Sequence, residues 1–100
     1  MIARIWKGRT PSSQAEEYFE YLKKTGLQDS RSTNGNQAVY ILRRIEGDEA
    51  EFLFLSLWDS IAAIKRFAGD DYEKAKYYPD DKNFLLELEP AVRHYEILNR

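Results

Sequence analysis

The sequence predicts a single α+β domain over residues 1–100, with the element order β-α-β-β-α-β. Three observations carry this prediction. A strand-like run opens the chain, two apolar runs flank the turn Glu46 to Glu49, and a segment that alternates across two faces closes it. Two amphipathic segments with helical spacing lie between these runs. One hundred residues are near the common size of one domain and can bury one hydrophobic core.

The first element is a strand over residues 2–9, which are rich in β-branched and aromatic side chains. Thr10 and Pro11 then predict a helix start, because threonine can cap free backbone N–H groups and proline is tolerated in the first turn. Ser13 with Glu16 offers a second start of the capping-box kind. The two starts stay open at this point.

The body of the first helix carries apolar side chains at positions that share one helix face, namely Ala15, Tyr18, Phe19 and Leu22. Gly26 predicts the end of this helix, since glycine adopts the left-handed conformation at no steric cost. Residues 28–37 are polar and contain an Asn-Gly pair, so they predict a connecting loop.

The clearest hairpin joins residues 38–46 to residues 50–58. In the second run both alternating sets are apolar: Phe52, Phe54 and Trp58 against Leu53, Leu55 and Leu57. This pattern predicts a central strand that is covered on both faces.

The second half begins with a helix that Asp59 or Ser60 caps and Gly69 ends. Asp70 or Asp71 can start another turn or two, which must stop before Pro79 because the residue before proline avoids helical angles. A broken helix is therefore expected. Residues 82–90 leave their state open, and residues 91–98 predict the last strand.

This element order is the ferredoxin-like split βαβ plan, an antiparallel sheet with helices on one face. The other face of a doubly apolar central strand then needs a cover. A homodimer through the sheet face is the expected solution, because closed two-fold dimers are the commonest oligomers.

Composition excludes several functions. The 15 basic and 17 acidic residues give a net charge of −2, which does not favour nucleic-acid binding. Cysteine is absent, so thiolate chemistry and sulfur-ligated metals are excluded. The aspartates around the second helix lack the spacing of a calcium loop, and capping and solubility explain them better. No signal peptide or membrane span is apparent, and we expect a cytoplasmic protein without metal or cofactor.

The stretches "FLFLSLWDSIAAIKRFAGDD", "AKYYPDD" and "VRHYEIL" resemble the antibiotic-biosynthesis-monooxygenase-like branch of the dimeric α/β-barrel superfamily. The similarity covers the whole chain in element order. It implies two subunits with their sheets face to face and a cleft in each subunit between sheet and helices. Some members are cofactor-independent monooxygenases of quinol-like substrates. Haem-degrading members use a histidine in the segment that corresponds to residues 72–78 and an asparagine on the first strand, and this chain has neither.

Aromatic side chains are the first candidates for a site. Trp58 closes a strand where the helix face begins, and it is a candidate catalytic residue as well as a candidate core residue. The candidate substrate-binding residues share aromatic rings, which suit a flat ligand: Trp6, Phe67, Tyr72, Tyr77 and Tyr78. The three tyrosines can equally cap the core or meet the partner subunit.

His94 and Arg43 complete the candidate catalytic set. His94 is the only histidine and titrates nearest to neutral pH, so it can act as a general base if it faces the cleft. Arg43 and Arg44 point in opposite directions, so one of them is expected to point inward, where it needs an acidic partner or an anionic ligand. Arg4 is a similar but weaker case.

Two functions fit these residues. The first is a cofactor-independent monooxygenase-like protein that acts on a small aromatic or quinol-type molecule. The second is a non-catalytic dimer that binds a small molecule in the same cleft, or a stress-related dimer of the same fold. A titratable group that converges on the cleft distinguishes the enzyme from the binding protein.

Overall fold

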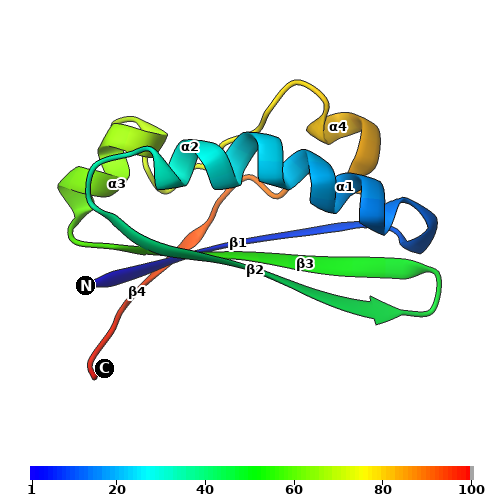
Figure 1. The fold of residues 1–100 in the computed structure, drawn as a ribbon, viewed down its shortest axis with the longest axis horizontal. Coiled ribbons are helices and arrows are strands. Elements are labelled where there is room, and N and C mark those ends of the chain that lie inside the picture. Colours follow the sequence, from blue (N-terminus) through cyan, green and yellow to red (C-terminus); the bar gives the residue numbers. More distant parts are fainter. Residues whose placement is uncertain (100) are drawn as a thin grey trace.

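A computed structural model describes residues 1–99 of the chain. Its antiparallel sheet has the order β2-β3-β1-β4, formed by β1 (Ile2–Pro11), β2 (Asn36–Glu46), β3 (Glu49–Trp58) and β4 (Arg93–Glu96). The helical elements lie over one face of this sheet (Figure 1): α1 (Ala15–Leu22), α2 (Gln28–Arg31), α3 (Ile61–Ala68) and α4 (Asp81–Phe84). The α+β, ferredoxin-like prediction is confirmed. Within residues 1–99, no helix has the length and apolar character of a membrane span.

The predicted hairpin is present, and it places β3 at the centre of the sheet. Gly47 has φ 62°, a value that suits the first central position of a tight hairpin turn. Phe52, Phe54 and Trp58 face the helices and are buried. Their partners across the strand pairs, such as Trp6 opposite Phe54, lie on the same face. The core therefore fills the space between the sheet and the helical layer.

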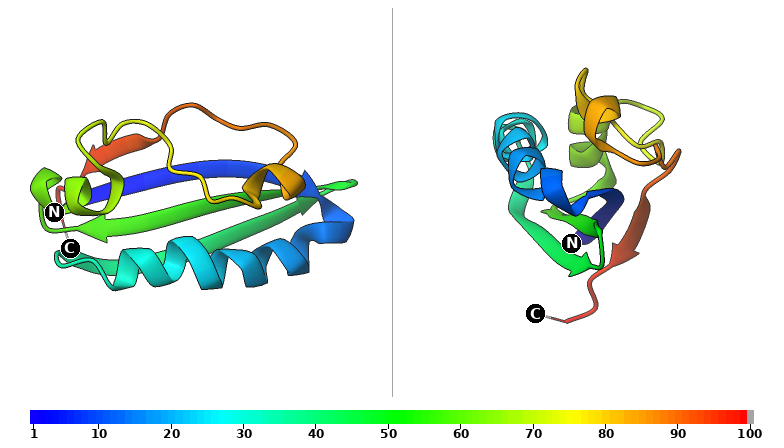
Figure 2. Two further views of the ribbon diagram at one scale, coloured as in Figure 1. Left: turned by 90° about the horizontal axis from the view of Figure 1, so that it is seen from above. Right: turned by 90° about the vertical axis from the view of Figure 1, so that its right-hand side faces the viewer.

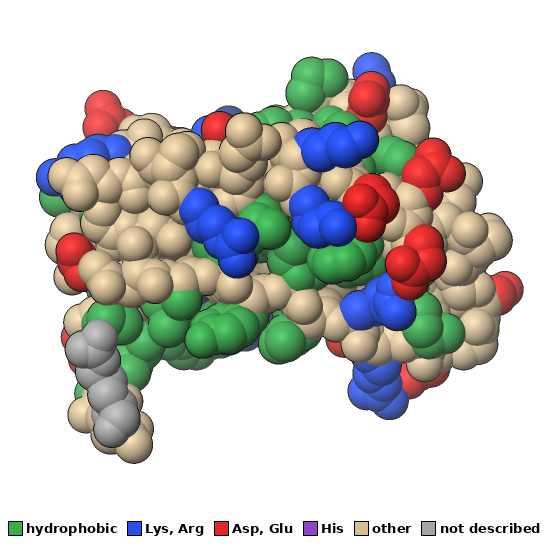
Figure 3. Space-filling view, viewed as in Figure 1, with side chains coloured by type: hydrophobic (Ala, Val, Ile, Leu, Met, Phe, Trp, Pro, Cys, Tyr) green, Lys and Arg blue, Asp and Glu red, His purple; other side chains and the backbone are tan. Residues whose placement is uncertain are grey.

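The opposite face of the sheet carries no helix (Figure 2). The strand register places a group of apolar side chains together on it: Ala3, Ile5, Ala38, Tyr40, Leu42, Leu53, Leu55, Leu57 and Tyr95. The charged residues Lys7, Arg44, Glu51 and Arg93 share this face. Tyr40, Leu42 and Tyr95 are each about half exposed. Hydrophobic side chains show along the underside of the molecule in the space-filling view (Figure 3). We call this surface the open sheet face.

The first helix differs from the prediction at both ends. β1 continues through Thr10 to Pro11, so Thr10 does not cap the helix. A 3-10 turn at Ser12–Gln14 precedes α1, and no side chain caps it. Gly26 does not end the helix either: it lies in a π-helical turn, Lys23–Leu27, that leads into α2, so the predicted loop begins only after α2.

The second half shows a further difference. Ser60 caps α3 through its hydroxyl, which accepts from the backbone N–H of Ala63, and Gly69 ends α3 with φ 88°. No second helical stretch follows directly. Residues 69–80, which we call the strap, are irregular and cross above the sheet (Figure 2). Ala75 N–H donates to the Pro90 carbonyl, so the strap pairs with the chain before β4 instead of coiling.

Two smaller differences complete the second half. α4 begins after Pro79, where the sequence predicted only that a helix would stop before it. β4 spans four residues, Arg93–Glu96, and is shorter than the predicted strand over residues 91–98. The short strand leaves much of β1 without a hydrogen-bonded neighbour on that side.

Candidate functional site

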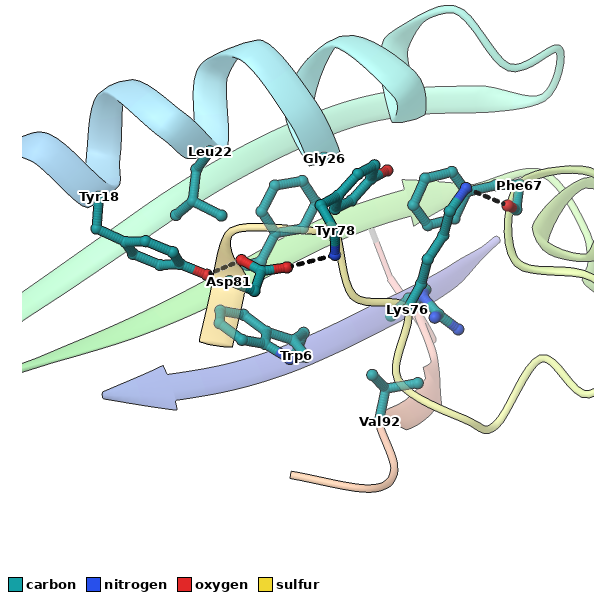
Figure 4. Close-up of a pocket in the computed structure, with 11 residues that line it drawn as sticks. Trp6, Tyr18, Leu22, Gly26, Phe67, Lys76, Tyr78, Asp81 and Val92 are labelled. Atoms are coloured by element: carbon teal, nitrogen blue, oxygen red, sulfur yellow. Dashed lines mark hydrogen bonds between the residues drawn. The ribbon is translucent and has the colours of Figure 1, made fainter. Parts of the chain in front are cut away.

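A small cavity lies between the sheet and its covering layer, roofed by the strap (Figure 4). Its volume is about 40 Å³. Side chains from β1, β3, α1, α3, α4, the strap and the chain just before β4, together with the π-helical Gly26, line it: Arg4, Trp6, Tyr18, Leu22, Gly26, Phe54, Phe67, Lys76, Tyr78, Asp81 and Val92. Five of these eleven residues carry aromatic rings, while two cations and one carboxylate also line the cavity.

Arg4 is the unusual member of this lining, because it is a charged residue that is only 4% exposed. Its Nη1 donates to the carbonyl oxygen of Tyr72 at 2.5 Å, and its Nη2 lies 3.4 Å from the carbonyl oxygen of Lys74. Within residues 1–99 no carboxylate forms an ion pair with it. Burial lowers the pKa of Arg4 to about 10, so the side chain is still a cation at neutral pH. A buried charge of this kind favours an anionic ligand.

His94 lies beside Arg4 at the back of the cavity. Arg4 Nη1 is 3.1 Å from His94 Nε2, and because a guanidinium can only donate, Nε2 must carry no proton. Burial, and then the charge of Arg4, lower the pKa of His94, which favours the neutral ring. Tyr72 packs edge-on against that ring at 5.2 Å. His94 therefore holds the guanidinium in place and does not line the cavity.

Lys76 and Tyr78 form the roof over the cavity. Lys76 Nζ donates to the Phe67 carbonyl at 2.9 Å and lies 4.4 Å above the centre of the Phe67 ring. The Tyr78 hydroxyl donates to Asp29 of α2 at 2.6 Å. Burial, followed by the bond to Asp29, raises the pKa of Tyr78, so its hydroxyl stays protonated. A few polar contacts thus hold the strap against the helical layer.

Asp81, the first residue of α4, is 4% exposed and lies at the opposite end of the lining from Phe67 (Figure 4). Its Oδ1 accepts from the Tyr18 hydroxyl at 2.8 Å, and its Oδ2 accepts from the backbone N–H of Tyr78 at 2.6 Å. Burial raises the pKa of Asp81, while these two hydrogen bonds act in the opposite direction. The carboxylate is therefore a buried acceptor on the cavity wall.

The predicted aromatic residues divide into two groups. Trp6, Phe67 and Tyr78 line the cavity. Tyr77 lies behind Trp6, with its ring edge-on at 6.2 Å and its hydroxyl 3.3 Å from the Trp6 indole nitrogen. Tyr72 contributes its carbonyl oxygen to Arg4. The structure thus brings five predicted residues to one region, although their binding roles stay predictions.

Two predicted catalytic residues lie elsewhere. Trp58 is fully buried, and its indole N–H donates to Ser56 Oγ at 2.8 Å beneath α3. Arg43 is on the exposed part of β2 and pairs with Glu16 of α1. Neither lines the cavity. Arg43 lies on the helix-covered side of β2, opposite Phe52, and Glu16 is its acidic partner. Arg44 lies on the opposite face of the strand and pairs with Glu46.

From the sequence, Arg4 was a weaker candidate for an inward cation than Arg43 or Arg44. Lys76 and Asp81 were not predicted as lining residues. A signal for Arg4 was present, because it alternates in register with Trp6 and so shares the buried face of the first strand. Asp81 had no such signal. It stands among other aspartates, and only the fold of the strap brings it under Tyr18.

Two solved structures share this fold along nearly the whole chain. A crystal structure of a MhuD variant with two manganese protoporphyrin IX molecules bound per active site aligns with a TM-score of 0.62 and 14% identity, covering 100% of this chain and 97% of that one. Rv0793 from Mycobacterium tuberculosis aligns with a TM-score of 0.62 and 16% identity, covering 99% and 96%. The scan against family models and the search of curated proteins found no match. The resemblance seen in the sequence is thus confirmed at the level of the fold.

Proposed function

We propose that this chain is a cytoplasmic, cofactor-independent monooxygenase-like enzyme that binds a small, planar, anionic aromatic molecule in the cavity. Arg4 carries the proposal. It is a buried cation without an ion pair within residues 1–99, and it faces a cavity walled by Trp6 and Phe67. Within residues 1–99 its hydrogen bonds use Nη1 and Nη2, so its Nε–H is available to a ligand. A phenolate or enolate oxygen would supply the missing counter-charge.

The proposed reaction needs no electron donor other than the substrate. A hydroxy-aromatic molecule loses its hydroxyl proton, and the electron-rich phenolate reacts with dioxygen at a ring C–H carbon. That carbon becomes a carbonyl carbon, and the second oxygen atom leaves as water with the two hydrogens that the substrate has lost. The protein would stabilise the anion, orient the ring and exclude water.

Each residue near the cavity has a role in this proposal. Arg4 would stabilise the negative charge of the substrate, and neutral His94 would keep the guanidinium in place. Trp6 and Phe67 would hold the ring by stacking. Tyr77 would fix the Trp6 ring through its hydroxyl.

The strap would act as the entrance. A cavity of about 40 Å³ is far smaller than the several hundred Å³ typical of ligand sites. A ring can therefore enter only if the strap moves outward, which requires the Tyr78–Asp29 and Lys76–Phe67 contacts to break. Such irregular segments with few contacts open more easily than helices or strands.

A second copy of the chain is the proposed cover of the open sheet face. This face presents exposed apolar side chains, including Tyr40, Leu42 and Tyr95, in register across the four strands. A two-fold dimer would bury them symmetrically. Sedimentation of wild type and Leu42→Glu tests this: the wild type should sediment as a dimer and the variant as a monomer. A monomeric wild type would contradict the proposed cover.

Binding without chemistry is the second candidate function. One observation favours it: neither His94 nor Trp58, the residues predicted to be catalytic beside Arg43, lines the cavity. The same Arg4 and aromatic walls would then retain a small aromatic anion, or serve a stress-related dimer, without oxidising it.

Fluorescence and oxygen uptake together separate these functions. The protein is titrated with a series of naphthols and quinols while tryptophan emission is followed, and oxygen uptake is recorded with the compounds that bind. An enzyme should consume one dioxygen per quinone formed. Trp6→Phe should abolish most of the quenching, whereas Trp58→Phe should retain it. Saturable quenching without oxygen uptake would favour the binding protein, and the absence of quenching would overturn both functions.

A further inference from the structure

We propose that Asp81 is the proton acceptor of this site, and that its ligand is an aromatic molecule whose hydroxyl donates to Asp81 while the charge it gains is held by Arg4. This inference rests on the proposed function, because it assigns a substrate class and a catalytic residue to the same cavity. It is carried by two opposite charges that line one small cavity.

The position of the Asp81 carboxylate supports this role. Asp81 is buried and lines the cavity together with Arg4, yet the two do not form an ion pair. Within residues 1–99 no lysine or arginine pairs with Asp81 at all. A carboxylate and a guanidinium that line the same cavity without meeting can hold the two polar ends of one molecule once the strap has moved outward.

The hydrogen-bonding capacity of the carboxylate also supports this role. Tyr18 and the backbone N–H of Tyr78 each occupy one acceptor position, on different oxygens of Asp81. An ionised carboxylate has about four acceptor positions, so a ligand hydroxyl can still donate to it. Burial raises the pKa of Tyr18, which keeps the tyrosine proton in place, so Tyr18 donates and does not compete for a proton.

The charge balance of proton transfer supports it as well. The ligand O–H bond breaks, the proton forms an O–H bond on Asp81, and the electron pair stays on the ligand oxygen. The net charge of the cavity does not change, because Asp81 becomes neutral as the ligand becomes an anion. The new negative charge spreads over the aromatic ring toward Arg4. Burial favours this transfer, since it makes the Asp81 carboxylate more basic than one in water.

A purely structural role of Asp81 is the competing explanation, because the side chain also ties Tyr18 to the strap. Two variants separate the roles. Asp81→Asn keeps a side chain of the same shape and removes the proton acceptor. Tyr18→Phe removes one of the two hydrogen bonds to this side chain and leaves the carboxylate. A structural role predicts that both variants behave alike.

The experiment binds para-nitrophenol to the full chain at a pH below the pKa of the free phenol. Its phenolate absorbance reports ionisation, and infrared difference spectra report whether a carboxyl group gains a proton. We expect wild type and Tyr18→Phe to bind the phenolate with a new protonated-carboxyl band. Asp81→Asn should bind without that band and release the proton to the buffer.

Each of the other outcomes contradicts one defined part of the proposal for Asp81. If the ligand binds to wild type as a neutral phenol, or as a phenolate without the carboxyl band, Asp81 is not the proton acceptor, although the binding site stands. If the band also appears in Asp81→Asn, it belongs to another carboxyl and the assignment fails. If wild type binds neither this phenol nor the naphthols and quinols, the proposed function fails and this inference fails with it.

Discussion

The two tryptophans of this chain lie on the same face of the sheet in different surroundings. Trp58 is completely buried, and Ser56, two residues away on its own strand, accepts its indole N–H. Trp6 is 8% exposed and borders the cavity, and its indole nitrogen lies 3.3 Å from the hydroxyl of Tyr77. Mainly α3 covers Trp58, with Tyr72 of the strap beside it, whereas the strap provides the hydrogen-bond partner of Trp6.

This difference shows what makes one half of the covered face a core and the other a candidate site. Over Trp58, α3 supplies Ala63 and Ile64, which fill the space completely. Over Trp6 the chain between Gly69 and Asp80 forms neither helix nor strand, and side chains of different sizes leave a gap. The same ring type therefore contributes to stability at one end of the sheet and borders a ligand space at the other.

The largest effects are expected when each tryptophan ring is removed in turn. Trp58→Ala should lower the free energy of unfolding by about 3–5 kcal/mol, because the packed surroundings cannot collapse around the lost ring. Trp6→Ala should cost less, since its ring already borders a cavity. Urea denaturation measures both. Equal losses, or a larger loss at Trp6, would contradict the division into a core half and a cavity half.

The hydroxyl of Tyr77 allows a finer test of the cavity half. Tyr77→Phe leaves the Trp6 N–H and the Glu89 carbonyl without their partner and should cost about 1–3 kcal/mol. Tyr72→Phe is the matched control, because no hydrogen bond within residues 1–99 uses the Tyr72 hydroxyl; its effect should stay within about 0.5 kcal/mol. If the two variants lose the same stability, the Tyr77 hydroxyl does not anchor Trp6.

The pH dependence of stability tests the contact between His94 and Arg4. The pKa of His94 is lowered in the folded chain, so the unfolded chain binds its proton more readily. The contribution of His94 to the free energy of unfolding is therefore complete above the pKa of histidine in the unfolded chain, about 6.5. It is lost as the pH falls below that value.

Arg4, Tyr72 and Glu73 are the groups that act on His94, and only Glu73 favours its protonation. His94→Gln should weaken the rise in stability between about pH 5 and pH 7. Thermal unfolding at several pH values measures this slope. An unchanged slope in the variant would mean that protonation of His94 is not coupled to folding.

A small effect on stability is expected at Gly26. A methyl group added there would lie 3.3 Å from the Phe54 ring and 3.9 Å from the Tyr78 ring, inside the cavity lining. Gly26→Ala should change the free energy of unfolding by at most about 1 kcal/mol, because the gain in helix propensity offsets the tight contact. Quenching by naphthol should nevertheless weaken. Unaltered affinity would show that the ligand does not occupy this end of the cavity.

The sequence predicted the fold well where one local rule decided each element. The alternation in β3, Gly47 in the hairpin turn and the cap at Ser60 all correspond to the structure. It failed where tertiary contacts overrode local preference. Gly26 suggested a helix end, yet the chain continues through a π-helical turn, and the strap pairs with the chain around Pro90 instead of forming helix.

The site was predictable only in part. Trp6, Phe67 and Tyr78 were predicted from their rings, and the structure places all three on the cavity wall. The sequence favoured Arg43 over Arg4 as the inward-pointing cation, because alternation alone does not say which part of a strand is covered. In the structure β2 is an edge strand, so Arg43 is exposed and pairs with Glu16, whereas Arg4 lies on the inner strand β1.

A comparison of these two arginines gives the most direct test of whether the buried Arg4 cation anchors the ligand. Wild type, Arg4→Met and Arg43→Met are titrated with an anionic hydroxynaphthoate while tryptophan emission is followed, with circular dichroism to confirm the fold of each variant. The account predicts that Arg4→Met weakens binding by about tenfold or more, the loss expected when a charge-assisted hydrogen bond disappears, and that Arg43→Met binds like wild type. Equal affinity of wild type and Arg4→Met would contradict the account, because the buried cation would then not be the anchor of the site.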